Sequence, residues 1–271
     1  MAKTWLIASG KGGVGKSTVT ACLGTALARM GRRVCIVDAD IGLRDQDALL
    51  GLENRIVYDL VDVARKDCLL SEALISPEDA SGLSLLPASQ FARVKELDPK
   101  AFRRILAELK VIFDFILIDC PAGVERGLRG LMSDQINETI LVCTPDDICI
   151  RNAERAMAVM EKKGLPRPQL IMNRLQPELI RSGEMYSAQV AAVTLDVGVL
   201  GEVPEDQSVY RAALKHISPM NVECEASHAF TRIARRMAGY DIPLPAYGSD
   251  KLPWYKRLFR PKLKEVTPID H

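Results

Sequence analysis

The chain has 271 residues, a formal net charge of +1 and 48% hydrophobic residues. This length suits one α/β domain with a large core, and the near-neutral charge argues against a global basic surface for nucleic acid. The cysteines include no Cys-x-x-Cys pair, which argues against a zinc or iron–sulfur ligand set. We expect Cys22, Cys35 and Cys143 to be small buried side chains in a reducing compartment. The first strand begins close to Met1 and no apolar run is long enough to span a membrane, so we expect a cytoplasmic protein without a signal peptide.

A glycine-rich segment follows the first predicted strand. Residues 9–18 read Ser-Gly-Lys-Gly-Gly-Val-Gly-Lys-Ser-Thr, between an apolar run at residues 5–8 and a helical pattern at residues 19–30. A strand, this loop and a helix in that order predict a P-loop, whose backbone N–H groups and helix dipole bind phosphate. Lys16 would reach the β- and γ-phosphates of ATP, and the Ser17 hydroxyl would bind Mg²⁺. The nucleotide-contacting residues predicted from this loop are Gly10, Gly12, Gly13, Val14, Gly15, Lys16, Ser17 and Thr18.

The same loop also fits the dinucleotide fingerprint Gly-x-Gly-x-x-Gly. Its glycines would be Gly10, Gly12 and Gly15, and Asp38 ends the next strand near where a ribose-binding acid is expected. The two interpretations differ at the Lys-Ser pair that closes the loop. A dinucleotide site has no use for an ammonium and a hydroxyl at the start of the helix, whereas a triphosphate with Mg²⁺ needs both. The sequence therefore favours the P-loop.

Two later apolar strands each end in an acid. Residues 34–38 are apolar up to Asp38, with Asp40 two positions later, and residues 115–119 are apolar up to Asp119. Carboxylates just past the ends of strands beside a P-loop lie where open α/β sheets bind ligands. We expect Asp119 to bind Mg²⁺ directly or through water, as in a Walker-B strand. Asp38 would hold the magnesium shell or the loop, and Asp40 would orient the attacking water within the same metal site; solvated turn acids are the alternative for these two.

The remaining pattern alternates strands and helices. Residues 45–80 are expected to be helical and rich in loops, and Gly123 would let the turn after the Walker-B strand move with the γ-phosphate. Further strands are expected at residues 83–87, 139–143, 169–174 and 199–206. Helices are expected at residues 101–111 and 148–162, and again between residue 206 and about residue 239. This alternation predicts an α/β, three-layer fold, with a mainly parallel, twisted sheet, right-handed crossovers and helices on both faces.

The motifs together resemble those of a known family. The loop at residues 10–17, with lysine in its second position, is similar to the deviant Walker A motif of the ParA/MinD ATPases, which are P-loop NTPases of the SIMIBI type. Four further segments resemble the cell-division branch of this family in particular, at residues 38–44, 86–90, 119–123 and 204–209. The resemblance covers residues 1–240, which we expect to form one ATPase domain, and implies an ATP hydrolase that positions the division septum.

The resemblance also implies a homodimer that forms with ATP and Mg²⁺. Lys11 would cross to the phosphates of the partner subunit and stabilise charge in the transition state, as an arginine finger does. Hydrolysis would then be slow and would depend on dimerisation or on a partner. The catalytic residues implied are Lys11, Lys16 and Asp40. Asn173, with Arg174 beside it, and the backbone near Pro204 would hold the adenine.

Regulatory partners are implied as well. They would be a division inhibitor (MinC-like) and an activator (MinE-like or MinJ/DivIVA-like), with no specific nucleic acid. The chain departs from the family at two places, because it has Asp45-Gln46 where Asn-Leu is usual and Arg151-Asn152 where an acid usually follows the arginine. The second place lies on the face that binds regulatory partners in the family, which leaves the identity of the partners open.

The composition changes after residue 240. Prolines stiffen an expected linker at residues 241–249, and residues 250–264 carry six cations and a single acid, Asp250, before a tail at residues 265–271. Pro253 and Pro261 would bound a short amphipathic helix, which is too short to hold in water and would fold at an anionic membrane surface. The membrane-contacting residues predicted are Leu252, Trp254, Tyr255, Lys256, Arg257, Leu258, Phe259 and Arg260. A tail that packs on its own domain or stays disordered is the alternative.

These observations predict a peripheral-membrane ATPase on the inner face of the bacterial cell membrane. Two weak tails on one ATP-bound dimer would bind lipid together, because the second contact becomes intramolecular. A partition ATPase of the ParA type that binds nonspecific DNA is the alternative function. A nucleotide switch or scaffold with negligible turnover is a third.

Overall fold

The structure is a computed structural model, which describes the chain apart from residue 1 and residues 94–95, 122–133, 216, 246 and 248–271. Seven strands form a single sheet in the order β3-β2-β4-β1-β5-β6-β7. Every neighbouring pair of these strands is parallel. The strands are β1 (Lys3–Ala8), β2 (Val34–Asp38), β3 (Leu83–Leu86), β4 (Phe115–Asp119), β5 (Glu138–Cys143), β6 (Gln169–Leu175) and β7 (Val199–Pro204). The predicted parallel sheet is confirmed.

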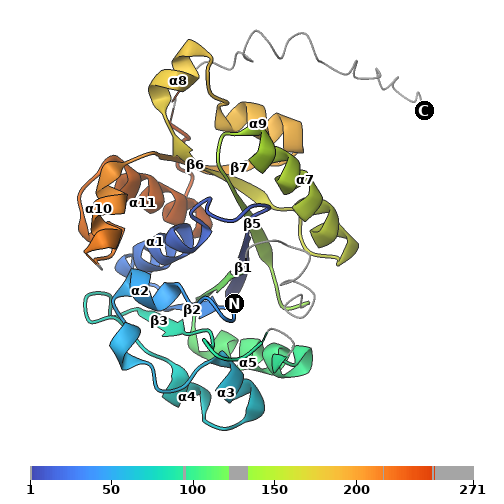
Figure 1. The fold of residues 1–271 in the computed structure, drawn as a ribbon, viewed down its shortest axis with the longest axis vertical. Helices are drawn as coiled ribbons and strands as arrows, with labels where there is room; N and C mark the ends of the chain where they lie inside the picture. Colours follow the sequence, from blue (N-terminus) through green and yellow to red (C-terminus); the bar gives the residue numbers. More distant parts are fainter. Residues whose placement is uncertain (1, 94–95, 122–133, 216, 246, 248–271) are drawn as a thin grey trace.

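Helices cover both faces of the sheet (Figure 1). On one face, α1 packs against β2 and β4 and against α11, which in turn packs on β7. On the other face, α5 contacts β4, α7 contacts β5, and α9 contacts β6 and β7. The principal helices are α1 (Lys16–Arg29), α5 (Pro99–Ile112), α7 (Asp147–Lys162), α9 (Ala188–Leu195), α10 (Gln207–Leu214) and α11 (Glu225–Met237). This arrangement is the predicted three-layer α/β fold.

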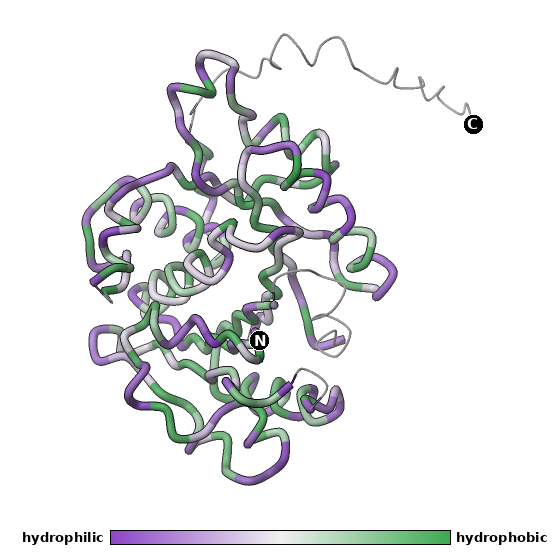
Figure 2. The backbone as a smooth tube through the Cα atoms, in the orientation of Figure 1, coloured by the Kyte–Doolittle hydropathy of each residue, from purple (hydrophilic) through white to green (hydrophobic). Residues whose placement is uncertain are grey.

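Burial on both faces explains the composition of the strands. β2 and β4 are buried along their whole length, which is why both read as continuous apolar runs instead of alternating patterns. Figure 2 shows apolar stretches in the interior, surrounded by segments in which apolar and polar residues alternate. The cysteines predicted to be buried, Cys22, Cys35 and Cys143, are fully shielded from solvent.

Capping residues fix where several helices begin. Asp98 accepts a hydrogen bond from the backbone of Ala101 at 3.2 Å at the start of α5, and Pro99 occupies the first turn. Asp206 accepts from the backbone of Ser208 at 2.8 Å, which starts α10. The strand expected at residues 199–206 therefore ends earlier, at Pro204, because Asp206 already belongs to the next helix.

The segments with weak patterns fold as short helices. Residues 45–80 contain α2 (Gln46–Leu50), the 3₁₀ turn η1 (Glu53–Arg55), α3 (Leu60–Arg65) and α4 (Leu70–Ala73), in agreement with the expected helix-and-loop region. Two helices between β6 and β7 were not predicted, α8 (Pro177–Ser182) and α9. A second 3₁₀ turn, η3 (Pro219–Asn221), precedes α11.

The strand order places the chemistry-bearing segments together. β1 lies between β4 and β5, and β2 lies on the other side of β4, so the carboxyl ends of β1, β2 and β4 adjoin. In the register of β2 and β4, Asp38 is directly opposite Asp119, and Ile7 of β1 is opposite Asp119 on its other side. The loop after β1 and the acids of β2 and β4 therefore meet at one edge of the sheet, as open α/β folds predict for a ligand site.

The segment after α11 lies against the domain. Arg236 donates hydrogen bonds to the carbonyls of Ile242 at 2.7 Å and Pro243 at 2.6 Å, and Arg232 contacts the Tyr247 hydroxyl at 3.2 Å. The predicted amphipathic segment at residues 250–264, the tail at 265–271 and Gly123 lie outside the described residues. Within the described part of the chain, no helix is both long and apolar enough to cross a membrane.

Candidate active site

The glycine-rich loop connects β1 to α1 in a conformation that requires glycine. Gly13 and Gly15 have φ angles of 76° and 88°, in the left-handed region, and Gly15 is the N-cap of α1. A Cβ on Gly15 would lie 2.5 Å from the Asn173 side chain, and one on Gly10 would lie 2.3 Å from the backbone of Asn152. The loop is thus held between β6 and the first turns of α7. The helix α1 begins at Lys16, directly after the last glycine of the loop. This start is earlier than residue 19, where the apolar spacing predicted the helix to begin.

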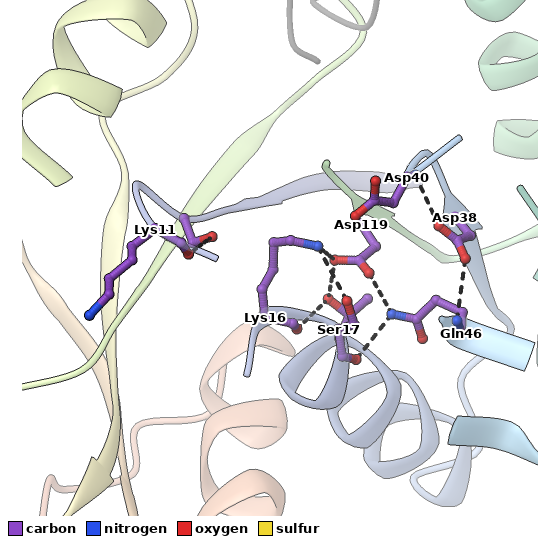
Figure 3. A network of polar contacts seen from close by, with 9 residues as sticks. Lys11, Lys16, Ser17, Asp38, Asp40, Gln46 and Asp119 are labelled. Carbon is purple, nitrogen blue, oxygen red and sulfur yellow. Dashed lines mark hydrogen bonds and ion pairs between the residues drawn. The ribbon is translucent and has the colours of Figure 1, made fainter. Parts of the chain in front are cut away.

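Lys16 is buried at the start of α1 and is paired with the acid of β4. Its Nζ lies 2.5 Å from Asp119 Oδ1 and 3.4 Å from Ser17 Oγ, and only 6% of the side chain is exposed. Burial alone would lower the pKa of Lys16, but the adjacent Asp119 carboxylate outweighs it and raises the pKa. Lys16 is therefore a buried, charged ammonium beside the Ser17 hydroxyl (Figure 3).

Asp119 is held by three side chains from two helices, α1 and α2. Besides Lys16, its Oδ1 accepts from Thr20 Oγ1 of α1 at 3.2 Å, and its Oδ2 accepts from Gln46 Nε2 of α2 at 2.7 Å. The sequence predicted the lysine and the acid at this site but assigned no role to Gln46. Its only signal was the departure from the family pattern at positions 45 and 46.

Asp38 lies beside Asp119 and is fully buried. It accepts hydrogen bonds from the backbone N–H of Asp40 at 3.0 Å and of Gln46 at 3.3 Å. Burial, together with the nearby Asp119 charge, raises the pKa of Asp38 to about 8. The two acids expected in the metal site thus lie side by side, and Asp40, which is also buried, lines the same cavity as the P-loop residues.

The donor set fits a magnesium ion better than a softer metal. Ser17 hydroxyl and carboxylate oxygens are hard ligands, and Mg²⁺ at nucleotide sites uses one or two protein ligands together with phosphate oxygens and water. A buried acceptor, Gln46 Oε1, also lies in this cluster with no hydrogen-bond partner among the described residues. The described part of the chain contains no group of three His, Cys, Asp or Glu side chains arranged as a ready-made metal cage.

Lys11 occupies a different environment at the start of the same loop. Its side chain is 42% exposed and points away from the Lys16 cluster (Figure 3), with Nζ 3.7 Å from Asp146 Oδ1 in the loop between β5 and α7. Partial burial opposes the shift, but hydrogen bonds from Thr144 and the backbone N–H of Cys149, with Lys11 nearby, lower the pKa of Asp146. The Lys11 side chain therefore lies apart from the Lys16–Asp119 pair.

A second and larger cleft lies beside the cavity over the P-loop. A cleft of about 1180 Å³ is lined by Asn173, Arg174 and Pro204, the three residues expected near the adenine, and by residues of α10. A cavity of about 530 Å³ over the P-loop and Asp40 shares Gly15, Thr18 and Arg174 with it. Asn173 also donates from Nδ2 to the Val14 carbonyl at 2.8 Å, so the same side chain supports the loop. The two spaces therefore adjoin at these shared residues.

Comparisons with known proteins agree with this geometry. The family described as ParA: NUBPL iron-transfer P-loop NTPase matches residues 1–238. The septum site-determining protein MinD of Synechocystis is 41% identical over 241 residues, which are 88% of this chain and 90% of the relative. The chain belongs to the MinD group of the ParA/MinD family of P-loop NTPases.

Solved MinD structures share the fold. A chain of the MinC:MinD cell division protein complex of Aquifex aeolicus has a TM-score of 0.82 and 34% identity, and covers 92% of this chain and 100% of its own length. The MinD of Pyrococcus horikoshii, solved in complex with Mg-ADP, has a TM-score of 0.77 and 32% identity, with coverage of 88% and 96%. The predicted relationship to the ParA/MinD ATPases is thereby confirmed, and with it the assignment to a septum site-determining group of P-loop ATPases.

Proposed function

We propose that this chain is a magnesium-dependent ATPase that dimerises with ATP and then binds the membrane, where it recruits a division inhibitor. The observation that carries the proposal is the buried Lys16–Asp119 pair at 2.5 Å beside the Ser17 hydroxyl, at the phosphate end of a cleft with room for a base. The MinD relative with bound Mg-ADP supports ATP and Mg²⁺ as the ligands.

The chemistry follows from the groups around the phosphate end. Backbone N–H groups of the P-loop and the N-terminus of α1 would bind the phosphates, and Lys16 would turn from Asp119 toward the β- and γ-phosphates. Ser17 and Asp119, with Asp38 behind them, would hold Mg²⁺, which neutralises developing charge on the phosphate oxygens. Asp40, in the same cavity as the P-loop, would orient the attacking water.

The position of Lys11 supports a requirement for a second copy. A P-loop supplies one lysine to its own phosphates, and Lys11 is exposed and directed away from that site. Across a dimer interface it could reach the phosphates of the partner, where a second cation stabilises the transition state as an arginine finger does. Hydrolysis would then be slow in single chains and faster in dimers.

The adenine would lie in the cleft between β6 and α10. Asn173 gives its Nδ2 to the Val14 carbonyl, which leaves its Oδ1 to accept a hydrogen bond from the adenine amino group. Arg174, which adopts a positive φ of 58°, and the backbone near Pro204 would complete the contacts. Asn173 would therefore couple base binding to the shape of the P-loop.

Membrane attachment would come from residues 250–264. This stretch combines clustered cations with aromatic residues, a composition typical of interfacial helices over anionic lipid. One such segment binds weakly, and two on one dimer can gain about 10²–10⁴ in avidity. ATP would thus control attachment by controlling dimerisation. The protein would be cytoplasmic and peripheral on the inner face of the cell membrane.

A division inhibitor resembling MinC would bind the membrane-attached dimer, as the Aquifex complex indicates for its own MinD. An activator resembling MinE, or MinJ with DivIVA, would then stimulate hydrolysis and release the dimer. The region around Arg151 and Asn152 at the start of α7 is close to the P-loop, since Asn152 backbone lies against Gly10. A partner on this helix could act directly on the loop.

The test combines turnover with lipid binding. Phosphate release by the full chain is measured with Mg²⁺ and ATP, and sedimentation is measured with phosphatidylglycerol-rich or pure phosphatidylcholine vesicles under ATP, ADP or no nucleotide. We expect ATP-dependent sedimentation with the anionic vesicles only, and its loss when residues 250–271 are removed. Equal sedimentation under ATP and ADP would contradict the proposal, and ATP-dependent, salt-sensitive retention on nonspecific DNA would favour a partition ATPase instead.

A further inference from the structure

Gln46 connects the P-loop with the two acids that end β2 and β4. Its side chain is fully buried at the start of α2. Nε2 donates to the Ser17 carbonyl of the P-loop at 3.0 Å and to Asp119 Oδ2 of the Walker-B strand at 2.7 Å. Its backbone N–H donates to Asp38 Oδ2 at 3.3 Å. One residue therefore contacts both buried acids and the residue whose hydroxyl is expected on Mg²⁺ (Figure 3).

The orientation of the Gln46 amide is set by its neighbours. Both side-chain contacts are oxygens that accept hydrogen bonds, a carbonyl and a carboxylate, so the NH₂ group must face them. Oε1 is then directed elsewhere, and it is buried without a hydrogen-bond partner among the residues that the structure describes. A buried carbonyl oxygen without a donor is unfavourable, which indicates that this oxygen has a partner in the working protein.

The chemistry of the surroundings identifies the class of that partner. Mg²⁺ keeps several of its waters in nucleotide sites, and water bound to a divalent cation is a strong hydrogen-bond donor. Hydrogen bonds from such an outer shell orient the ligands and tune metal affinity. We propose that Gln46 is a positioning residue for the magnesium site, in which Nε2 holds Asp119 and Oε1 accepts a hydrogen bond from a magnesium-bound water. This inference rests on the proposed function.

The same contacts would couple the metal to α2. Gln46 is the first residue of that helix, and Asp47, the second, is held to Arg44 by an ion pair at 2.8 Å. A change at the magnesium shell would therefore be transmitted through Gln46 to the start of α2, and through its backbone N–H to Asp38. Gln46 acts on the metal through water and through Asp119, and it does not contact the reacting phosphate.

The test separates metal binding from nucleotide binding. The affinity of the full chain for ADP is measured with Mg²⁺ at a series of concentrations and again with EDTA, for the native protein, Gln46→Leu and Gln46→Glu. Gln46→Leu removes both polar atoms of the side chain. We expect the Mg²⁺ concentration that gives half of the maximal increase in ADP affinity to rise about 10–100-fold, while the affinity for ADP measured in EDTA is unchanged. Gln46→Glu keeps an acceptor in place of Oε1 but loses the Nε2 donor to Asp119 Oδ2 and the Ser17 carbonyl, so we expect it to depart from the native magnesium response as well.

Controls make each outcome decisive. Gln135→Leu, at a glutamine whose side chain donates to the Arg103 carbonyl at 3.4 Å, should behave as native. Thermal unfolding confirms that each variant folds, and Gln46→Met replaces Gln46→Leu if the latter does not. A native magnesium response in Gln46→Leu would overturn the inference alone. Equal ADP affinity with and without Mg²⁺ in the native chain would overturn the proposed magnesium dependence, and the inference with it.

Discussion

Lys11 and Lys16 belong to the same loop but lie in opposite environments. The Lys16 side chain is 6% exposed, and its Nζ lies 2.5 Å from Asp119 Oδ1. The Lys11 side chain is 42% exposed, and its Nζ lies at the longer distance of 3.7 Å from Oδ1 of a half-exposed acid, Asp146. The difference separates two uses of a cation. Removal of a buried, paired ammonium is costly to folding, and we propose that Lys16 binds phosphate in its own chain, whereas the exposed Lys11 contributes little to folding and remains available to a second molecule.

The comparison predicts how much unfolding free energy at pH 7 each mutation removes. The largest loss is expected for substitution of Lys16. Lys16→Ala leaves Asp119 buried beside Asp38 without its cation, and removal of one partner of a buried pair costs about 3–5 kcal/mol. Phosphate release should fall at least about 10³-fold, because the charge on the β- and γ-phosphates loses its main side-chain contact. Chemical denaturation and a phosphate-release assay measure the two effects. A loss below about 1 kcal/mol would show that the Lys16–Asp119 pair is not buried as described.

Asp38 tests the same network through pH. Its pKa is raised to about 8 by burial and by Asp119, so the folded chain keeps a proton that the unfolded chain has released. Stability is then lost as pH rises from the ordinary aspartate range toward pH 8, by about 1.4 kcal/mol for each unit of pKa displacement.

Asp38→Asn removes this dependence. We expect the variant to show a flatter profile of unfolding free energy between pH 5 and pH 8, and to be the more stable protein at pH 8, by a few kcal/mol at most. Its response to Mg²⁺ in ADP binding should weaken. Denaturation series at several pH values without nucleotide provide the measurement, and identical slopes for native and variant would contradict the raised pKa.

Substitution of Asn173 is expected to lower the unfolding free energy less than substitution of Lys16 and more than substitution of Lys11. Asn173→Ala removes the hydrogen bond from Nδ2 to the Val14 carbonyl, which is buried, and we expect a loss of about 1 kcal/mol in unfolding free energy. ATP affinity should fall about tenfold, because the loop loses a support and the base loses a contact. Asn173→Asp lacks the donor but keeps an acceptor and is the matched control. Unchanged ATP affinity in both variants would separate Asn173 from the nucleotide.

Lys11 gives the smallest effect on folding. Lys11→Ala should change the unfolding free energy by less than about 0.5 kcal/mol, since the Lys11–Asp146 pair is exposed. Hydrolysis should nevertheless fall about 10²–10³-fold if the lysine acts on the phosphates of a partner. Denaturation and phosphate release at several protein concentrations provide the comparison. A large loss of stability with normal turnover would reverse the roles assigned to the two lysines.

Much of the fold follows from the sequence because the strands are buried on both faces. β2 and β4 occupy the predicted residues 34–38 and 115–119, since a continuous apolar run ending in Asp leaves little freedom in where the strand stops. α8 and α9 were missed because each is short, and short helices depend on tertiary packing more than on a periodic pattern.

The sequence predicted the residues of the candidate site that belong to a recognisable motif. It did not predict the residues that only tertiary packing brings to the site. The P-loop and the acids of β2 and β4 were predicted from strand ends, and the structure brings Lys16, Asp38 and Asp119 together. Gln46 contacts Asp119 from a segment without a usable pattern, 73 positions away in the sequence. The Asn173–Val14 hydrogen bond joins residues 159 positions apart, so no local signal could reveal it.

The central claim, that Lys11 acts on the site of a partner and Lys16 on its own, is tested most directly by mixing two inactive variants. Lys11→Ala and Asp40→Ala should each release little phosphate alone. In a mixed dimer, one site combines its own Asp40 with Lys11 from the other chain, so an equal mixture should recover about a quarter of native turnover. If Lys11 acted within its own chain, no site in the mixture would be complete. Turnover no higher than that of the separate variants would contradict the account.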